Sequence, residues 1–137
     1  MVMIFQSPKA LKYLLEEGDV YTFRVHSRKS LKKDDWITDK RGGHKISDAT
    51  IEFVTVIDRL SGLSSYVSRS GFESLTDWFN EIKRLNPNDI AAQANIISGY
   101  LYHVTKKEKN SKFLKAMLND EVISFGEIEI DKQKETK

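Results

Sequence analysis

The sequence predicts a single α+β domain built on a mixed, partly closed β-barrel with flanking helices. Three observations lead to this expectation. The 137 residues suffice for one hydrophobic core and are too few for two ordinary domains. Apolar residues alternate with a period of two in some segments and recur at helical spacing in others. Strand and helix segments follow one another without tandem βαβ units or internal repeats.

The first two elements are a short strand and an amphipathic helix. Residues 1–6 form an apolar run that predicts a buried strand. Ser7 and Pro8 provide an N-cap and a proline at the first helical position, and Gly18 provides a left-handed C-terminal stop. A helix is therefore expected between Ser7 and Gly18.

Two strands separated by a long polar loop come next. Residues 20–25 have a period of two, which predicts a strand with Thr22 and Arg24 on its polar face. Residues 26–45 show no apolar period, so we expect a loop, and loops of this length are commonly functional or disordered. Residues 46–57 alternate again and predict a strand with one face buried throughout.

A serine-rich connection and the clearest helix of the chain follow. Residues 61–70 break the strand pattern, and we expect a short strand there around Tyr66. Ser74 begins a capping box, and the apolar stripe behind it ends before Pro87, which predicts a helix with Trp78 in the core.

The last part of the chain closes the domain and extends beyond it. Asp89 predicts the cap of a brief helical turn, and residues 96–104 read as a closing strand. We therefore divide the chain into a domain over residues 1–104 and a C-terminal extension over residues 105–137. The extension is expected to hold a short helix and a strand, to pack on the domain and to end in a disordered basic tail.

Composition excludes several classes of protein. With 22 basic and 20 acidic side chains, the net charge of +2 identifies no partner. The absence of cysteine excludes disulfides, thiolate nucleophiles and cysteine zinc sites, and the three histidines lack the spacing of a metal motif. We expect no cofactor and no metal. No apolar run approaches the ~20 residues that cross a bilayer, and the N-terminus lacks a signal-peptide pattern, so we expect a cytoplasmic protein with no membrane partner.

A basic segment spans residues 28–45, where seven basic residues stand against three acidic ones. The basic residues are Arg28, Lys29, Lys32, Lys33, Lys40, Arg41 and Lys45. Lysine and arginine neutralise phosphates and the ring of Trp36 can stack on a base, so the segment predicts contact with RNA, or alternatively with DNA. The competing interpretation is a solvated linker that pairs with Asp34, Asp35 and Asp39, with Trp36 folded back over the barrel end.

Three segments resemble the ASCH domains, a branch of the PUA-like superfamily. They are residues 18–24 (GDVYTFR), 71–78 (GFESLTDW) and 98–102 (SGYLY), similar to the first strand, the start of the later helix and the closing strand of that family. The resemblance covers Met3 to Val104. It implies a concave face between strands and helices that suits a nucleotide or a short RNA segment. Thr22 and Arg24 are the positions carried over to that face.

Two departures from the family decide between binding and catalysis. Members that resemble nucleoside amidohydrolases have a lysine shortly after the first glycine, where this chain has Asp19 and Val20. The usual Gly-Asp entry into the following strand is replaced by residues 42–45 (GGHK), which make that rim more basic. The resemblance therefore favours a binding module over an enzyme.

Three hypotheses for function follow. The first is an RNA-binding module whose basic segment contacts phosphate while Thr22 and Arg24, together with Tyr21 or Trp36, meet a base or sugar. The second is a hydrolase acting on a modified nucleoside or RNA, in which Thr22 and an acid such as Asp19 or Glu73 assist proton transfer. The third is a protein-interaction domain that uses the C-terminal extension.

Overall fold

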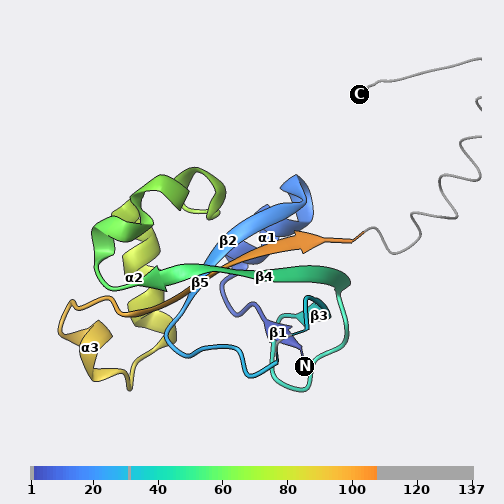
Figure 1. Ribbon diagram of the computed structural model, residues 1–137, viewed down its shortest axis with the longest axis horizontal. Coiled ribbons are helices and arrows are strands. Elements are labelled where there is room, and N and C mark those ends of the chain that lie inside the picture. Colours follow the sequence, from blue (N-terminus) through green and yellow to red (C-terminus); the bar gives the residue numbers. More distant parts are fainter. Residues whose placement is uncertain (1, 31, 108–137) are drawn as a thin grey trace, which may run out of the picture. The chain divides into compact units, whose positions relative to one another are not determined.

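A curled, mixed sheet forms the centre of the protein. The structure, a computed structural model, describes residues 2–30 and 32–107 (Figure 1). Within these residues five strands form one open half-barrel in the order β1-β3-β4-β5-β2. The β1–β3 pair is parallel and the other neighbours are antiparallel, so the predicted α+β class and mixed sheet are confirmed.

The N-terminal elements follow the sequence prediction closely. β1 (Met3–Ile4) leads into α1 (Pro8–Glu17), which ends directly before β2 (Asp19–Arg24). The hydroxyl of Ser7 accepts a hydrogen bond from the first turn of α1. Gly18 ends the helix with φ of 95°, a left-handed conformation in which a residue with a Cβ would be strained. This tight junction packs α1 against β2 (Figure 1).

The segment predicted as a long loop contains a strand, so that prediction was wrong. β3 (Asp34–Thr38) lies between β1 and β4 (Ser47–Ile57) and pairs with both. Its sequence has few apolar residues, and the strand is held by backbone hydrogen bonds on both sides, which a local pattern does not reveal. Ile37 and Thr38 are buried, and Trp36 is half-buried.

β4 departs from the predicted alternation at Phe53. Phe53 is opposite Tyr102 and Thr55 is opposite Leu101, so Val54 is an extra residue in a β-bulge. Beyond the bulge the faces are exchanged. Phe53 is 55% exposed, whereas Ile57, which the alternation places on the same face, is 3% exposed. The prediction of one face buried along the whole strand was therefore wrong.

A 3-10 helix, η1 (Leu60–Arg69), replaces the short strand predicted in the serine-rich connection. Its apolar residues Leu60, Leu63 and Tyr66 recur every three positions, which matches the three residues per turn of a 3-10 helix. Leu63 is completely buried and the other two pack against the core. The spacing that looked irregular for a strand is thus regular for this helix.

The remaining elements are those expected from their capping residues. α2 (Leu75–Leu85) begins after Ser74, and α3 (Ile90–Gln93) begins after Asp89. In each case the side-chain oxygen accepts a hydrogen bond from the backbone N–H three residues on. The closing strand, β5 (Gly99–Lys106), starts and ends later than predicted and joins β4 to β2.

The core lies between the sheet and the helices. η1 and α2 gather near one end of β4, and β1 and β3 lie near the other end (Figure 1). Trp78 on α2 is 3% exposed and stacks on Phe72, which confirms its predicted place in the core. None of the helices in the described part of the chain is long and apolar enough to span a membrane. The helix, strand and tail expected in the C-terminal extension lie outside the described residues.

Candidate nucleic-acid interface

A cavity of about 430 Å³ lies between the two edge strands of the half-barrel, β1 and β2. Consecutive residues on both sides line it, residues 2–7 along β1 and its exit and residues 21–26 along β2 and its exit. α2 contributes Trp78 and Ile82. The cavity is therefore bounded by two strand edges that the curl of the sheet brings towards each other.

Arg24 spans the gap between these edge strands. Its Nη1 donates to the backbone oxygen of Ile4 at 2.6 Å, and its Nε donates to Oγ1 of Thr22 at 3.2 Å. Its guanidinium carbon lies 4.9 Å from the centre of the Phe5 ring. Thr22 and Arg24 both line the cavity, as their spacing of two on one strand predicts.

The charge of Arg24 has no carboxylate partner among the described residues. Burial lowers the pKa of Arg24 to about 10, so the side chain stays positively charged at neutral pH. Backbone and hydroxyl oxygens and one aromatic ring are its partners. A buried charge without a counter-ion costs free energy, and perturbed groups of this kind gather at functional sites.

Aromatic rings form much of the cavity wall. The rings come from Phe5, Tyr21, Phe72, Trp78 and Tyr102. Predominantly apolar walls with a few polar groups are typical of sites for small molecules and single nucleotides. Sequence reasoning had assigned Trp78 to the core and had considered Tyr21 for the site, and it missed Phe5, Phe72 and Tyr102. In the sequence, Tyr102 belongs to the SGYLY segment that resembles the closing strand of ASCH domains.

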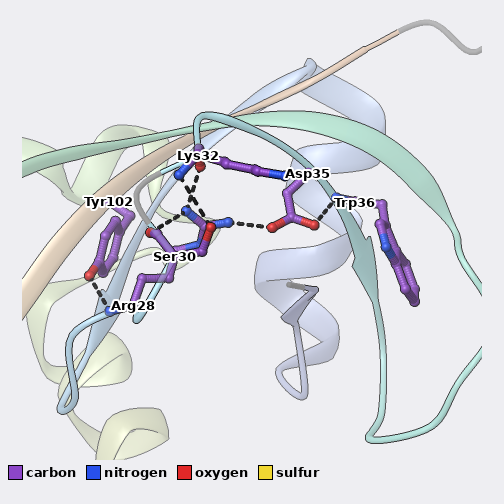
Figure 2. A network of polar contacts seen from close by, with 6 residues as sticks. All are labelled: Arg28, Ser30, Lys32, Asp35, Trp36 and Tyr102. Carbon is purple, nitrogen blue, oxygen red and sulfur yellow. Dashed lines mark hydrogen bonds and ion pairs between the residues drawn. The ribbon is translucent and has the colours of Figure 1, made fainter.

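Arg28 fixes the start of the basic segment to the sheet (Figure 2). Its Nη2 lies 2.5 Å from Oδ2 of Asp35, and both side chains are almost buried, at 11% and 4% exposure. Nη1 donates to the backbone oxygens of Ser30 and Lys32, and the backbone N–H of Arg28 donates to the hydroxyl of Tyr102 at 2.6 Å. The guanidinium of Arg28 is therefore held in an internal ion pair.

The other basic residues of the segment fall into two groups. Lys33 lies 3.5 Å from a carboxylate oxygen of Glu52, and Lys45 lies 3.0 Å from one of Asp48, both at the surface. The second group is exposed and has no carboxylate partner in the part of the chain that the structure describes. It consists of Lys29, Lys32, Lys40 and Arg41, which we call the open cations. Arg41 also lines the cavity.

Trp36 is placed differently from both interpretations of the sequence. It lies within β3, half-buried, and its backbone N–H donates to Oδ1 of Asp35 at 2.9 Å. In Figure 2 its ring points away from the Arg28 network. Trp36 does not line the cavity. At the cavity the structure thus brings together Thr22, Arg24, Arg28 and Arg41, and it leaves Trp36 apart from them.

The acids required by the hydrolase hypothesis do not join Thr22. Two hydrogen bonds from Arg69 hold the pKa of Asp19 below its usual range, against the effect of burial and with help from His103. Neither Asp19 nor Glu73 lines the cavity. Glu81 does line it, but hydrogen bonds from Arg84 lower its pKa. The lowered pKa values of Asp19 and Glu81 are opposite to the raised pKa that a general acid at neutral pH requires.

No group of three or more histidine, aspartate or glutamate side chains in the described residues could hold a metal ion.

No family model, curated protein or solved structure matches this chain. The resemblance to ASCH domains therefore stays a prediction. Inference about function has to start from the cavity, its charge and the surface around it.

Proposed function

We propose that this protein is an RNA-binding module that seats one nucleotide of a single strand in the cavity between β1 and β2. The observation that carries the proposal is the half-buried guanidinium of Arg24, which lines the cavity without a carboxylate partner among the described residues. An anionic ligand would supply the missing counter-charge, and guanidinium groups bind phosphate with strong, charge-assisted hydrogen bonds.

The shape and walls of the cavity favour a nucleotide over a simple anion. Its volume of about 430 Å³ exceeds what an inorganic ion needs and falls within the ~300–1,000 Å³ of small-molecule sites. The aromatic walls suit a base, because single-stranded bases are commonly bound by stacking on aromatic side chains. Thr22 adds a hydroxyl that can accept and donate hydrogen bonds beside Arg24.

The surface outside the cavity favours a strand over a free nucleotide. The open cations lie on the segment that Arg28 ties to Tyr102, and Arg41 reaches the cavity itself. Exposed lysine and arginine side chains that are not neutralised by carboxylates attract consecutive phosphates of a nucleic-acid backbone. We infer that the open cations contact successive phosphates of the RNA backbone while the cavity binds one nucleotide of the same strand.

Binding of a fluorescent single-stranded RNA of about twelve nucleotides tests the proposal. Its anisotropy at low salt should rise on addition of the protein. Arg24→Met should weaken the affinity at least tenfold, because it removes the charge and leaves an apolar chain of similar length. A DNA strand of the same sequence tests whether the sugar matters.

Arg59→Met is the matched control, because Arg59 is an exposed arginine whose only ion pair among the described residues is with its neighbour Asp58, and it does not line the cavity. This variant should bind RNA like the unchanged protein. If the unchanged protein binds no RNA, or if both arginine variants bind equally well, the proposal is wrong. Tighter binding of DNA than of RNA would correct the ligand to DNA.

A further inference from the structure

A patch of exposed apolar side chains lies on β4 and β5 outside the cavity. Phe53 is 55% exposed and Val56 is 59% exposed, and Tyr100 on the neighbouring strand is half-buried. Phe53 approaches Tyr100 with ring centres 6.4 Å apart. We call these three residues the aromatic platform. Exposed apolar side chains that adjoin one another on a sheet face mark binding surfaces more often than isolated ones do.

The aromatic platform and the cavity share one face of the sheet. Residues directly opposite each other in an antiparallel pair point to the same side. One row across three strands runs from Thr22 through Tyr102 to Phe53. The next row runs from Arg24 through Tyr100 to Val56. Each row therefore begins at the cavity wall and ends on the platform.

The β-bulge is what completes the second row. If β4 alternated regularly from Phe53 through Val54 with no bulge, Val56 would point to the opposite face, towards the side of Leu101. The bulge places Val56 opposite Tyr100 instead. Bulges that redirect a side chain are common beside functional sites.

The arrangement of the aromatic rings on this face leaves Phe53 available for stacking. Phe53 meets Tyr102 nearly edge-on, at 5.8 Å and 66°, and meets Tyr100 at 54°. Neither neighbour stacks on Phe53, and more than half of the side chain is exposed. A planar group can therefore stack on Phe53, and the faces of all nucleobases suit such stacking.

Charge near the platform identifies the class of partner. The backbone oxygen of Lys33 accepts a hydrogen bond from Ile51, two residues before Phe53, and Arg28 is bonded to Tyr102. The exposed open cations Lys29 and Lys32 are the direct neighbours in the chain of Arg28 and Lys33. A partner that presents a flat apolar surface next to negative charge complements this arrangement, and a nucleotide does so.

We propose that the aromatic platform binds a second base of the same RNA strand, stacked on Phe53, next to the nucleotide in the cavity. This inference rests on the proposed function and extends it from one nucleotide to at least two. Because stacking does not read base edges, the platform contributes affinity for any sequence. It also sets a minimum length, since a mononucleotide can fill the cavity without reaching the platform.

Two ligands distinguish the contribution of the platform to binding from that of the cavity. One is an RNA of about twelve nucleotides, which is long enough for a complete single-strand binding site, and the other is a nucleoside monophosphate, which is a single unit of the strand. Phe53→Ala should weaken RNA binding about tenfold and leave monophosphate binding unchanged. Arg24→Met should weaken both. Phe53→Tyr, which keeps a ring, should bind RNA within twofold of the unchanged protein. Ile90→Ala removes a side chain that is 86% exposed elsewhere and should change neither affinity.

The possible results are distinguishable. If RNA binds and Phe53→Ala binds it as tightly as the unchanged protein, the platform inference is wrong and the proposed function stands. If the unchanged protein binds no RNA, both fail. Sedimentation at increasing protein concentration tests a second copy of the chain as the occupant. A dimer that Phe53→Ala dissociates would assign the platform to self-association and overturn the inference.

Discussion

Arg24 carries a positive charge at a position where an apolar side chain of similar size would cost less free energy. Arg24→Met removes the cost of burying that charge and also removes the hydrogen bond to Ile4, and these effects oppose each other. We expect the free energy of unfolding in urea to change by less than about 1 kcal/mol. A loss above about 3 kcal/mol would show instead that Arg24 is a structural clamp between β1 and β2.

The pH dependence of the stability difference between the unchanged protein and Arg24→Met follows from the pKa of Arg24, which is about 10. In the unfolded chain Arg24 has its ordinary, higher pKa, so the unfolded state binds more protons only above about pH 10. The cost of the buried charge is therefore complete below that pH and is relieved above it. The stability difference between the unchanged protein and Arg24→Met should stay constant from neutral pH to about pH 9.

Asp19 provides the opposite case, a charge that stabilises the fold. Its carboxylate joins β2 to η1 through Arg69 and to β5 through His103, and these contacts lower its pKa below the ordinary value of about 3.9. Its contribution is present above that pH and is lost as the pH falls through the lower folded value. Asp19→Asn should cost about 1 kcal/mol at neutral pH, a modest value because the pair is partly exposed. Below about pH 4 the two proteins should converge in melting temperature.

Asp58→Asn is the control for Asp19, since Asp58 is exposed and, within residues 2–30 and 32–107, forms an ion pair only with its neighbour Arg59. It should leave the melting temperature unchanged at every pH. A constant difference between Asp19→Asn and the unchanged protein down to pH 2 to 3, within roughly the range of ordinary carboxyl titration, would show that the charge of Asp19 is not what stabilises the fold.

At the scale of elements, the start of β5 depends on a close approach of backbones. A Cβ on Gly99 would overlap the backbone oxygen of Arg24 and lie 2.6 Å from the Phe23 ring. Gly99→Ala should therefore lower the free energy of unfolding in urea by about 2–3 kcal/mol. Gly62 in η1 is the matched control, because its Cβ would lie 3.5 Å from Ile57, an ordinary contact. Equal stabilities of the two alanine variants would contradict this account of β5.

Elements with their own capping residues could be predicted from the sequence, and elements defined by distant partners could not. Ser7, Ser74 and Asp89 all cap the expected helices. β3 was missed because its hydrogen bonds to β1 and β4 hold it, not its own residue pattern. The bulge at Val54 was missed because alternation in β4 continues in the sequence while the pairing shifts by one residue.

At the scale of the molecule, the candidate site is a product of the curl of the sheet. Thr22 and Arg24 were predicted to share a face because they lie two apart on one strand. Their partners Ile4 and Phe5 come from the opposite edge of the sheet, about which the sequence of β2 carries no information. The same holds for the open cations, because only the fold distinguishes them from Arg28, which Asp35 neutralises.

That distinction leads to a prediction about salt. If the four open cations Lys29, Lys32, Lys40 and Arg41 contact phosphates, the slope of log affinity against log salt for single-stranded RNA should be about −3, from ~0.7 per contact. Changing all four to glutamine should remove most of the slope and leave about −0.7 from the phosphate contact of Arg24. The melting temperature should hardly change, because exposed charges contribute little to folding.

A second quadruple variant separates specific contacts from general charge. Lys9, Lys12, Arg59 and Lys83 lie outside the basic segment, and changing them to glutamine removes the same charge. If net charge alone drives binding, both variants should flatten the slope equally, and the basic segment would then be a solvated linker. If the open cations contact the RNA phosphates, the second variant should keep a slope of about −3, because counterions are released only where phosphates meet side chains. The slope therefore reports where the strand lies, which the affinity at a single salt concentration does not.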